Sequence, residues 1–208
     1  MLGRTHFFVG MTSALAIMQP ESLPILVAGT GAAALGGVIS DIDSGTSQAH
    51  KDADKVMGAS VLTIAVISVL EWYFHLGITH IIMENSDYFR IVCGILLFLL
   101  ICSYGMRQPH RAFMHSFAAL FTLSGCVAMI FPDIMPYFAI GFISHLFIDL
   151  FNRRNEKLLW PMKKGYCMHL CSSKGIVNRL LLTISIIATI ILIYESIPVQ
   201  SAILLVRK

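Results

Sequence analysis

Charged residues are scarce in this chain. They make up 13% of its 208 residues, whereas 56% are hydrophobic, and the mean hydropathy is +0.76. A typical soluble domain carries about 25% charged residues. The composition therefore argues against an ordinary soluble protein and predicts an all-α, polytopic membrane protein built as a helical bundle.

Several other features that would define a function are missing. The five cysteines are an odd number, and Cys93, Cys102 and Cys126 lie inside apolar runs, so no disulfide framework is predicted. The net charge is only +3, with no dense basic block, so no nucleic-acid partner is expected. The chain also has no phosphate-binding glycine loop, serine elbow or dinucleotide fingerprint.

What the chain does have is a series of about seven apolar segments, each a candidate transmembrane helix. They cover residues 5–18, 23–40, 56–75, 90–106, 112–131, 134–151 and 177–197. A spanning helix needs about 20 residues, so the first segment is short for a full crossing. We expect residues 1–208 to form a single integral membrane domain, with the first segment retained as a helix and not cleaved as a signal peptide.

The basic residues predict the orientation, because cytoplasmic loops carry the excess of lysine and arginine. With the N-terminus in the cytoplasm, twelve of the fifteen basic residues fall on the cytoplasmic side, and only Arg90, Arg207 and Lys208 fall on the other. Residues 151–176 are then a basic cytoplasmic loop. This loop is either a membrane-surface segment, as Trp160 and Tyr166 suggest, or an ordinary positively charged inner loop.

Histidines and aspartates are the candidate functional residues. His145 and Asp149 are four apart in an apolar segment, which places them on one helical face, and such groups are costly in hydrocarbon unless paired or functional. In the predicted orientation, the ends of four helices bring seven such residues into one cytoplasmic layer. They are His6, Asp41, Asp43, His110, His115, His145 and Asp149.

Histidine nitrogens and carboxylate oxygens are the ligands of hydrolytic metal sites. His110 and His115 can share a metal only if His110 lies in the loop before the helix, which Pro109 favours. Asp43 is a further ligand, a general base or a loop-stabilising carboxylate. Arg111 suits bidentate pairing with phosphate, although it also fits a positively charged inner flank.

Two weaker signals lie outside this layer. His50 and Asp54 repeat the four-residue spacing, but in a polar loop where a solvated face explains them. Cys167, His169 and Cys171 carry atoms that can bind metal, without the spacing of a zinc knuckle.

Five blocks of the sequence resemble the signatures of the YdjM-like bacterial membrane-bound metal-dependent hydrolases, also described as LexA-regulated inner-membrane hydrolases. The blocks are Thr5-His6, Ile39 to Asp43, His110 to Ser116, Gly141 to Asp149, and Leu159-Trp160-Pro161. Ser40 stands where the family has proline, Ala112 where it has glycine, and Met114 where it has threonine. Every candidate ligand and Arg111 are retained, so the resemblance implies the same metal site.

The resemblance implies a metal-dependent hydrolase in the bacterial inner membrane. A weaker likeness to zinc-dependent phospholipase C and P1-type nucleases suggests a phosphoester substrate, with one to three divalent ions, favouring Zn²⁺. We therefore expect membrane lipids or another amphiphilic phosphoester as partners, with the active site on the cytoplasmic face. The alternatives are a proton- or cation-coupled transporter and a non-catalytic, metal-stabilised regulatory protein. No feature of the sequence defines an oligomeric state.

Overall fold

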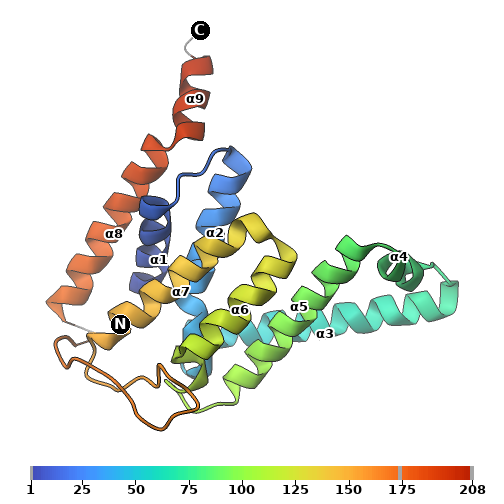
Figure 1. The fold of residues 1–208 in the computed structure, drawn as a ribbon, viewed down its shortest axis with the longest axis horizontal. Coiled ribbons are helices and arrows are strands. Elements are labelled where there is room, and N and C mark those ends of the chain that lie inside the picture. Colours follow the sequence, from blue (N-terminus) through green and yellow to red (C-terminus); the bar gives the residue numbers. More distant parts are fainter. Residues whose placement is uncertain (1, 173–174, 207–208) are drawn as a thin grey trace.

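The computed structural model describes residues 2–172 and 175–206, and this part of the chain is almost entirely helical (Figure 1). The main helices are α1 (Gly3–Ile17), α2 (Leu23–Ile39), α3 (Gln48–Phe74), α4 (Ile78–Glu84), α5 (Ser86–Met106), α6 (Phe117–Ile130), α7 (Met135–Leu150), α8 (Ile176–Glu195) and α9 (Ile197–Val206). Three short 3-10 turns, η1 (Ser40–Asp43), η2 (Phe113–His115) and η3 (Pro132–Ile134), lie between them. Lys174, Arg207 and Lys208, which were used to predict the orientation, lie outside the described residues.

The expectation of a helical membrane bundle is confirmed. Within residues 2–172 and 175–206, five helical segments are long and apolar enough to cross a membrane: Leu23–Asp43, Gln48–Phe74, Ser86–Met106, Pro132–Leu150 and Ile176–Glu195. Helix α6 is apolar but has only 14 residues, and α1 has 15, both below the usual spanning length of about 20. The count of about seven crossings therefore stays a prediction.

The predicted segment 112–131 is not one continuous helix, and His115 is not on its first turn. The chain instead makes the turn η2 and enters α6 only after Ser116, whose side chain accepts a hydrogen bond from the backbone N–H of Ala119. A serine at this position satisfies one of the free N–H groups of a helix start. Because of this break, His115 lies in a turn that faces the ends of α2 and α7.

Helices α1, α2 and α7 pack unusually closely. A Cβ atom placed on Gly141 of α7 would collide with the backbone of Ala33 in α2, and one on Gly36 would collide with the backbone of Phe138. A Cβ on Gly37 would likewise meet the backbone carbonyl of His6. Glycines thus let three backbones approach as only small residues allow in a membrane bundle, and this brings His6 and His145 together.

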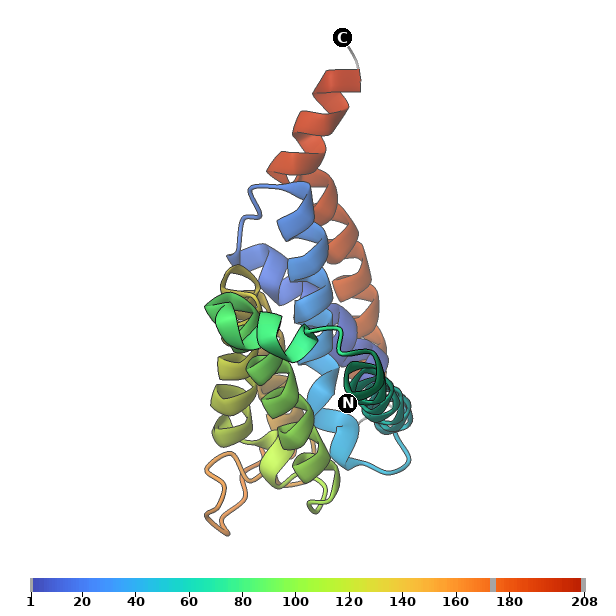
Figure 2. The ribbon, with the colours of Figure 1, turned by 90° about the vertical axis from the view of Figure 1, so that its right-hand side faces the viewer.

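Helix α3 differs from the rest of the bundle. It projects sideways from the end of α2 and returns through α4 and α5, as both views show (Figures 1 and 2). It has no buried residue along its length, and it contacts mainly η1 and α5. On another side of the bundle, α8 packs against α1. The side chain of Thr12 in α1 forms a 2.7 Å hydrogen bond with that of Thr189 in α8.

Candidate metal centre

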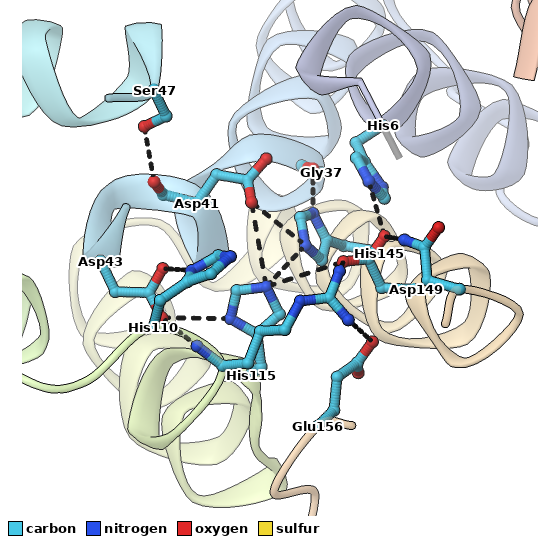
Figure 3. Close-up of polar contacts among 12 residues, drawn as sticks. His6, Gly37, Asp41, Asp43, Ser47, His110, His115, His145, Asp149 and Glu156 are labelled. Atoms are coloured by element: carbon cyan, nitrogen blue, oxygen red, sulfur yellow. Dashed lines mark hydrogen bonds and ion pairs between the residues drawn. The ribbon is translucent and has the colours of Figure 1, made fainter. Parts of the chain in front are cut away.

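All seven predicted ligands gather at one end of the bundle (Figure 3). His6 comes from the start of α1, Asp41 and Asp43 from η1, His110 from the loop before η2, His115 from η2, and His145 and Asp149 from α7. His110 lies in a turn and not on a helix, so the condition for it to approach His115 is met. Their ring centroids are 5.2 Å apart.

The imidazole of His145 is held in one orientation. Its Nδ1 lies 2.7 Å from the carbonyl oxygen of Gly37, which can only accept a hydrogen bond. The proton is therefore on Nδ1, and Nε2 presents a lone pair. The ring of His6 stacks on the other side, with centroids 3.9 Å apart. Both side chains are fully buried.

His115 lies beside a carboxylate. Its Nδ1 is 3.3 Å from Oδ2 of Asp43, in a geometry that is not aligned for a hydrogen bond, so this contact does not assign the proton of His115. Asp43 accepts hydrogen bonds from Nδ1 of His110 at 2.7 Å and from the backbone N–H of Arg111 at 2.9 Å. Asp43 therefore fixes His110 and the start of the following turn, and it lies against His115.

Four electron-rich atoms converge inside this frame. The Nε2 atoms of His115 and His145 are 3.3 Å apart, and Oδ1 of Asp41 lies 3.8 Å from the first and 3.9 Å from the second. Oδ2 of Asp149 lies 3.9 Å from Nε2 of His115. Four ligands at about 2.0–2.2 Å from a tetrahedral ion are spaced by about 3.3–3.6 Å.

This arrangement fits a cation. Nitrogen and oxygen atoms that can bind a cation lie close together here, and the hydrogen bond to Gly37 leaves Nε2 of His145 without a proton. That atom can accept a proton from Nε2 of His115, 3.3 Å away, or bind a metal ion in its place. Three overlapping groups can hold a metal ion in the described residues, and together they contain all seven predicted ligands.

Each of the three groups contains three of the predicted ligands. They are His6 with Asp41 and His145; His115 with His145 and Asp149; and Asp43 with His110 and His115. His6 reaches the centre from one side, with Nε2 at 3.1 Å from Oδ1 of Asp149, in a geometry that is not aligned for a hydrogen bond. Metal binding by these residues remains a prediction that the geometry permits.

Arg111 lies beside the centre and is itself buried. Its Nη2 donates to Oδ2 of Asp149 at 2.5 Å, and its Nη1 donates to the backbone carbonyl of Arg154 at 2.7 Å. The guanidinium is therefore committed to protein partners and neutralises one carboxylate of the centre. A role on a phosphoryl group stays a prediction.

Glu156, on the opposite side of Arg111, was not singled out from the sequence. Its Oε1 is 3.6 Å from Nη1 of Arg111, its side chain is fully buried, and within the described residues neither carboxylate oxygen accepts a hydrogen bond. Burial, reinforced by the nearby carboxylate of Asp149, raises the pKa of Glu156 to about 9. The only signal in the sequence was an acidic residue within a strongly basic loop.

The two weaker sequence signals lie apart from the centre. His50 and Asp54 lie in the first turns of α3 and not in the predicted loop, where His50 contacts the carbonyl oxygen of Ile42 and its Nε2 is 3.5 Å from Asp54. Cys167 Sγ lies 3.1 Å from Nδ1 of His169. None of the three metal-compatible groups of the described residues includes a cysteine.

Comparison with known proteins identifies a family for this chain. The family model described as the YdjM inner membrane protein matches residues 1–206. No curated protein and no solved structure matches the chain.

Proposed function

The chain belongs to the YdjM inner membrane protein family, and from this premise we propose that it is a metal-dependent hydrolase. In this proposal it is a multi-pass inner membrane protein that cleaves a phosphoester of a lipid or another amphiphile. The reaction takes place at the cytoplasmic face, where the basic residues of the sequence put the ends of α2 and α7.

One observation carries the proposal. The Nε2 atoms of His115 and His145 face each other at 3.3 Å beside the carboxylates of Asp41 and Asp149, and the hydrogen bond to Gly37 leaves Nε2 of His145 able to bind an ion. Two histidines and two carboxylates match the nitrogen and oxygen donors of hydrolytic zinc sites. When bound, a divalent metal supplies Lewis acidity and lowers the pKa of a coordinated water toward about 7.

The remaining residues have positioning and electrostatic roles in this proposal. Asp43 accepts a hydrogen bond from Nδ1 of His110, lies against Nδ1 of His115 and is the candidate general base. Arg111 fixes Asp149, and its positive charge stabilises negative charge that develops on a phosphoryl oxygen next to the centre. Asp41 is the one carboxylate of the centre with a partly exposed side chain, at 18%, and marks the side open to substrate.

The test uses the protein purified in detergent. We expect the wild type to retain stoichiometric zinc and to cleave a phospholipid in mixed micelles. His145→Ala and His115→Ala should lose both properties, whereas His80→Ala, with an exposed side chain in α4, should lose neither. A wild type that binds no divalent metal and is unaffected by chelator contradicts the proposal.

A second candidate function is favoured by the burial of the centre. His6, His115 and His145 are fully buried and Asp149 is 1% exposed, which is typical of structural metal sites with a closed ligand set. In that case the metal would stabilise a non-catalytic regulatory protein. Tightly bound metal that raises the melting temperature, without turnover of any phosphoester, identifies this alternative.

A further inference from the structure

An apolar groove lies in the half of the bundle away from the metal centre. It is bounded by one face of α2, which contributes Ala28, Ala32 and Leu35, and by the rings of Phe98 in α5 and Phe138 in α7. The spacing of the three α2 residues places them on one helical face. The groove has a volume of about 370 Å³, and its lining is apolar throughout.

The floor and the rim of the groove differ in exposure. Phe138 is fully buried and its ring is 6.2 Å from that of Phe98, which makes a closed aromatic floor. Leu35 on one side is 43% exposed, and Phe131 at the end of α6 is 61% exposed. The groove is therefore open along its length to whatever surrounds the bundle.

The surroundings are hydrocarbon. The groove is bordered by three of the segments that are long and apolar enough to cross a membrane, those containing α2, α5 and α7. At this depth the abundant molecules are lipid acyl chains, and a lining without polar groups offers nothing to a polar ligand. If a methylene takes about the volume of a liquid water, about 30 Å³, the groove holds roughly a dozen methylenes.

The distance from the metal centre matches one lipid leaflet. Leu35 precedes Asp41 by six residues and Ala28 precedes it by thirteen, which places the groove about 9 to 20 Å from the centre along α2 at about 1.5 Å per residue. Half of the hydrocarbon core is about 15 Å thick. A lipid whose head group is at the depth of Asp41 therefore has its chain beside the groove.

From these observations we infer that the groove binds one acyl chain of a membrane lipid. The inference extends the proposed function, on which it rests, because it identifies the substrate as an acyl lipid held by its chain. The small side chains of Ala28 and Ala32 create the space, so a larger residue at either position closes it.

The test measures binding and needs no turnover. The protein is reconstituted in phosphatidylglycerol vesicles that contain a trace of the same lipid with a diazirine near the methyl end of one chain, and labelled peptides are mapped by mass spectrometry. We expect label to concentrate on residues 131–138, at least about fivefold above the equally lipid-exposed residues of α3. Ala32→Trp should remove this excess, and Val27→Trp, on the adjacent exposed position of α2, should leave it unchanged.

The milder Ala28→Phe variant serves if Ala32→Trp does not fold, as checked by its gel-filtration profile. Even labelling of all exposed helices, or labelling unchanged in both filled variants, overturns the inference. The inference is also overturned if cross-linking shows that a second copy of the chain covers the groove and protects it from label. If cleavage persists under these outcomes, the hydrolase proposal survives. Localised labelling in a protein without metal or cleavage rejects the hydrolase and keeps the lipid site.

Discussion

The metal-centre end of the bundle and the α3 arm are built on opposite principles. At the centre, three glycine contacts hold α1, α2 and α7 at backbone distance, and seven histidine and aspartate residues interlock between them. Along α3 no residue is buried, and a Cβ on Gly58 would meet nothing within 4 Å. The same apolar composition thus yields a tightly specified site in one region and a helix defined by hydropathy alone in the other.

The largest difference between the two regions should appear when a methyl group is added to one glycine in each of them. Gly141→Ala forces α7 away from the backbone of Ala33, so we expect a loss of about 2–3 kcal/mol of stability and of bound metal. Gly58→Ala in α3 should instead stabilise slightly, by up to about 1 kcal/mol, because alanine is the better helix former. Unfolding in detergent and metal analysis measure both, and equal effects at the two glycines would refute the contrast.

The next effect concerns the carboxylate of Asp43. Asp43→Asn keeps the shape of the side chain but weakens the acceptor of the His110 hydrogen bond and removes the negative charge beside His115. We expect metal affinity to fall about 10–100-fold, as for other carboxylates that support ligand histidines. Competition with a chromogenic chelator measures this affinity. The matched control is Asp133→Asn in η3, at an exposed position, and a comparable loss there would show that the effect is not specific to the centre.

A pH-dependent effect should follow from Glu156. Its pKa in the folded protein is about 9, above the ordinary value of 4.5, so the folded state keeps a proton that the unfolded state has lost. Wild-type stability should therefore fall as the pH rises from about 4.5 to about 9. Glu156→Gln cannot ionise, and its melting temperature should match the wild type near pH 4.5 and exceed it increasingly toward pH 9.

Melting curves across that pH range provide the measurement, with Glu21→Gln as the control at an exposed position. A constant difference between Glu156→Gln and the wild type at all pH values would mean that Glu156 is ionised in the folded protein.

The smallest effect should come from the polar contact between α1 and α8. Thr12→Val removes the hydrogen bond to Thr189 that joins α1 to α8, and a typical interhelical bond in a membrane contributes about 0.6 kcal/mol. Thr183→Val, at an exposed position of α8, should change stability less. Double-mutant cycles with Thr189→Val isolate the pair from the other hydrogen bonds between α1 and α8, those of Thr12 to Ser185 and of Thr5 to Asn178, and a coupling energy of zero would show that this pair does not stabilise the docking of α8.

Local pattern was sufficient to predict most of the helices and the residues of the centre. Runs of apolar residues gave α2, α5, α7 and α8 to within a few residues, because the cost of exposing backbone in hydrocarbon makes a long apolar run helical. The break at Ser116 was not predicted. The apolar residues on both sides of this serine favour one continuous helix, whereas the serine favours the start of a new one. The helices α4 and α9 were not predicted, because they lie almost entirely outside the seven apolar segments.

The sequence by itself determined a helical membrane protein with its histidines and aspartates at the ends of particular helices, since hydropathy and spacing are local properties. Only the tertiary structure decided which atoms of those residues face one another. The proton on Nδ1 of His145 is assigned by the carbonyl of Gly37, more than a hundred residues away, and His110 is paired with the carboxylate of Asp43, 67 residues away. Glu156 shows the same limit, because a basic loop gives no sign that one of its carboxylates is buried against Arg111.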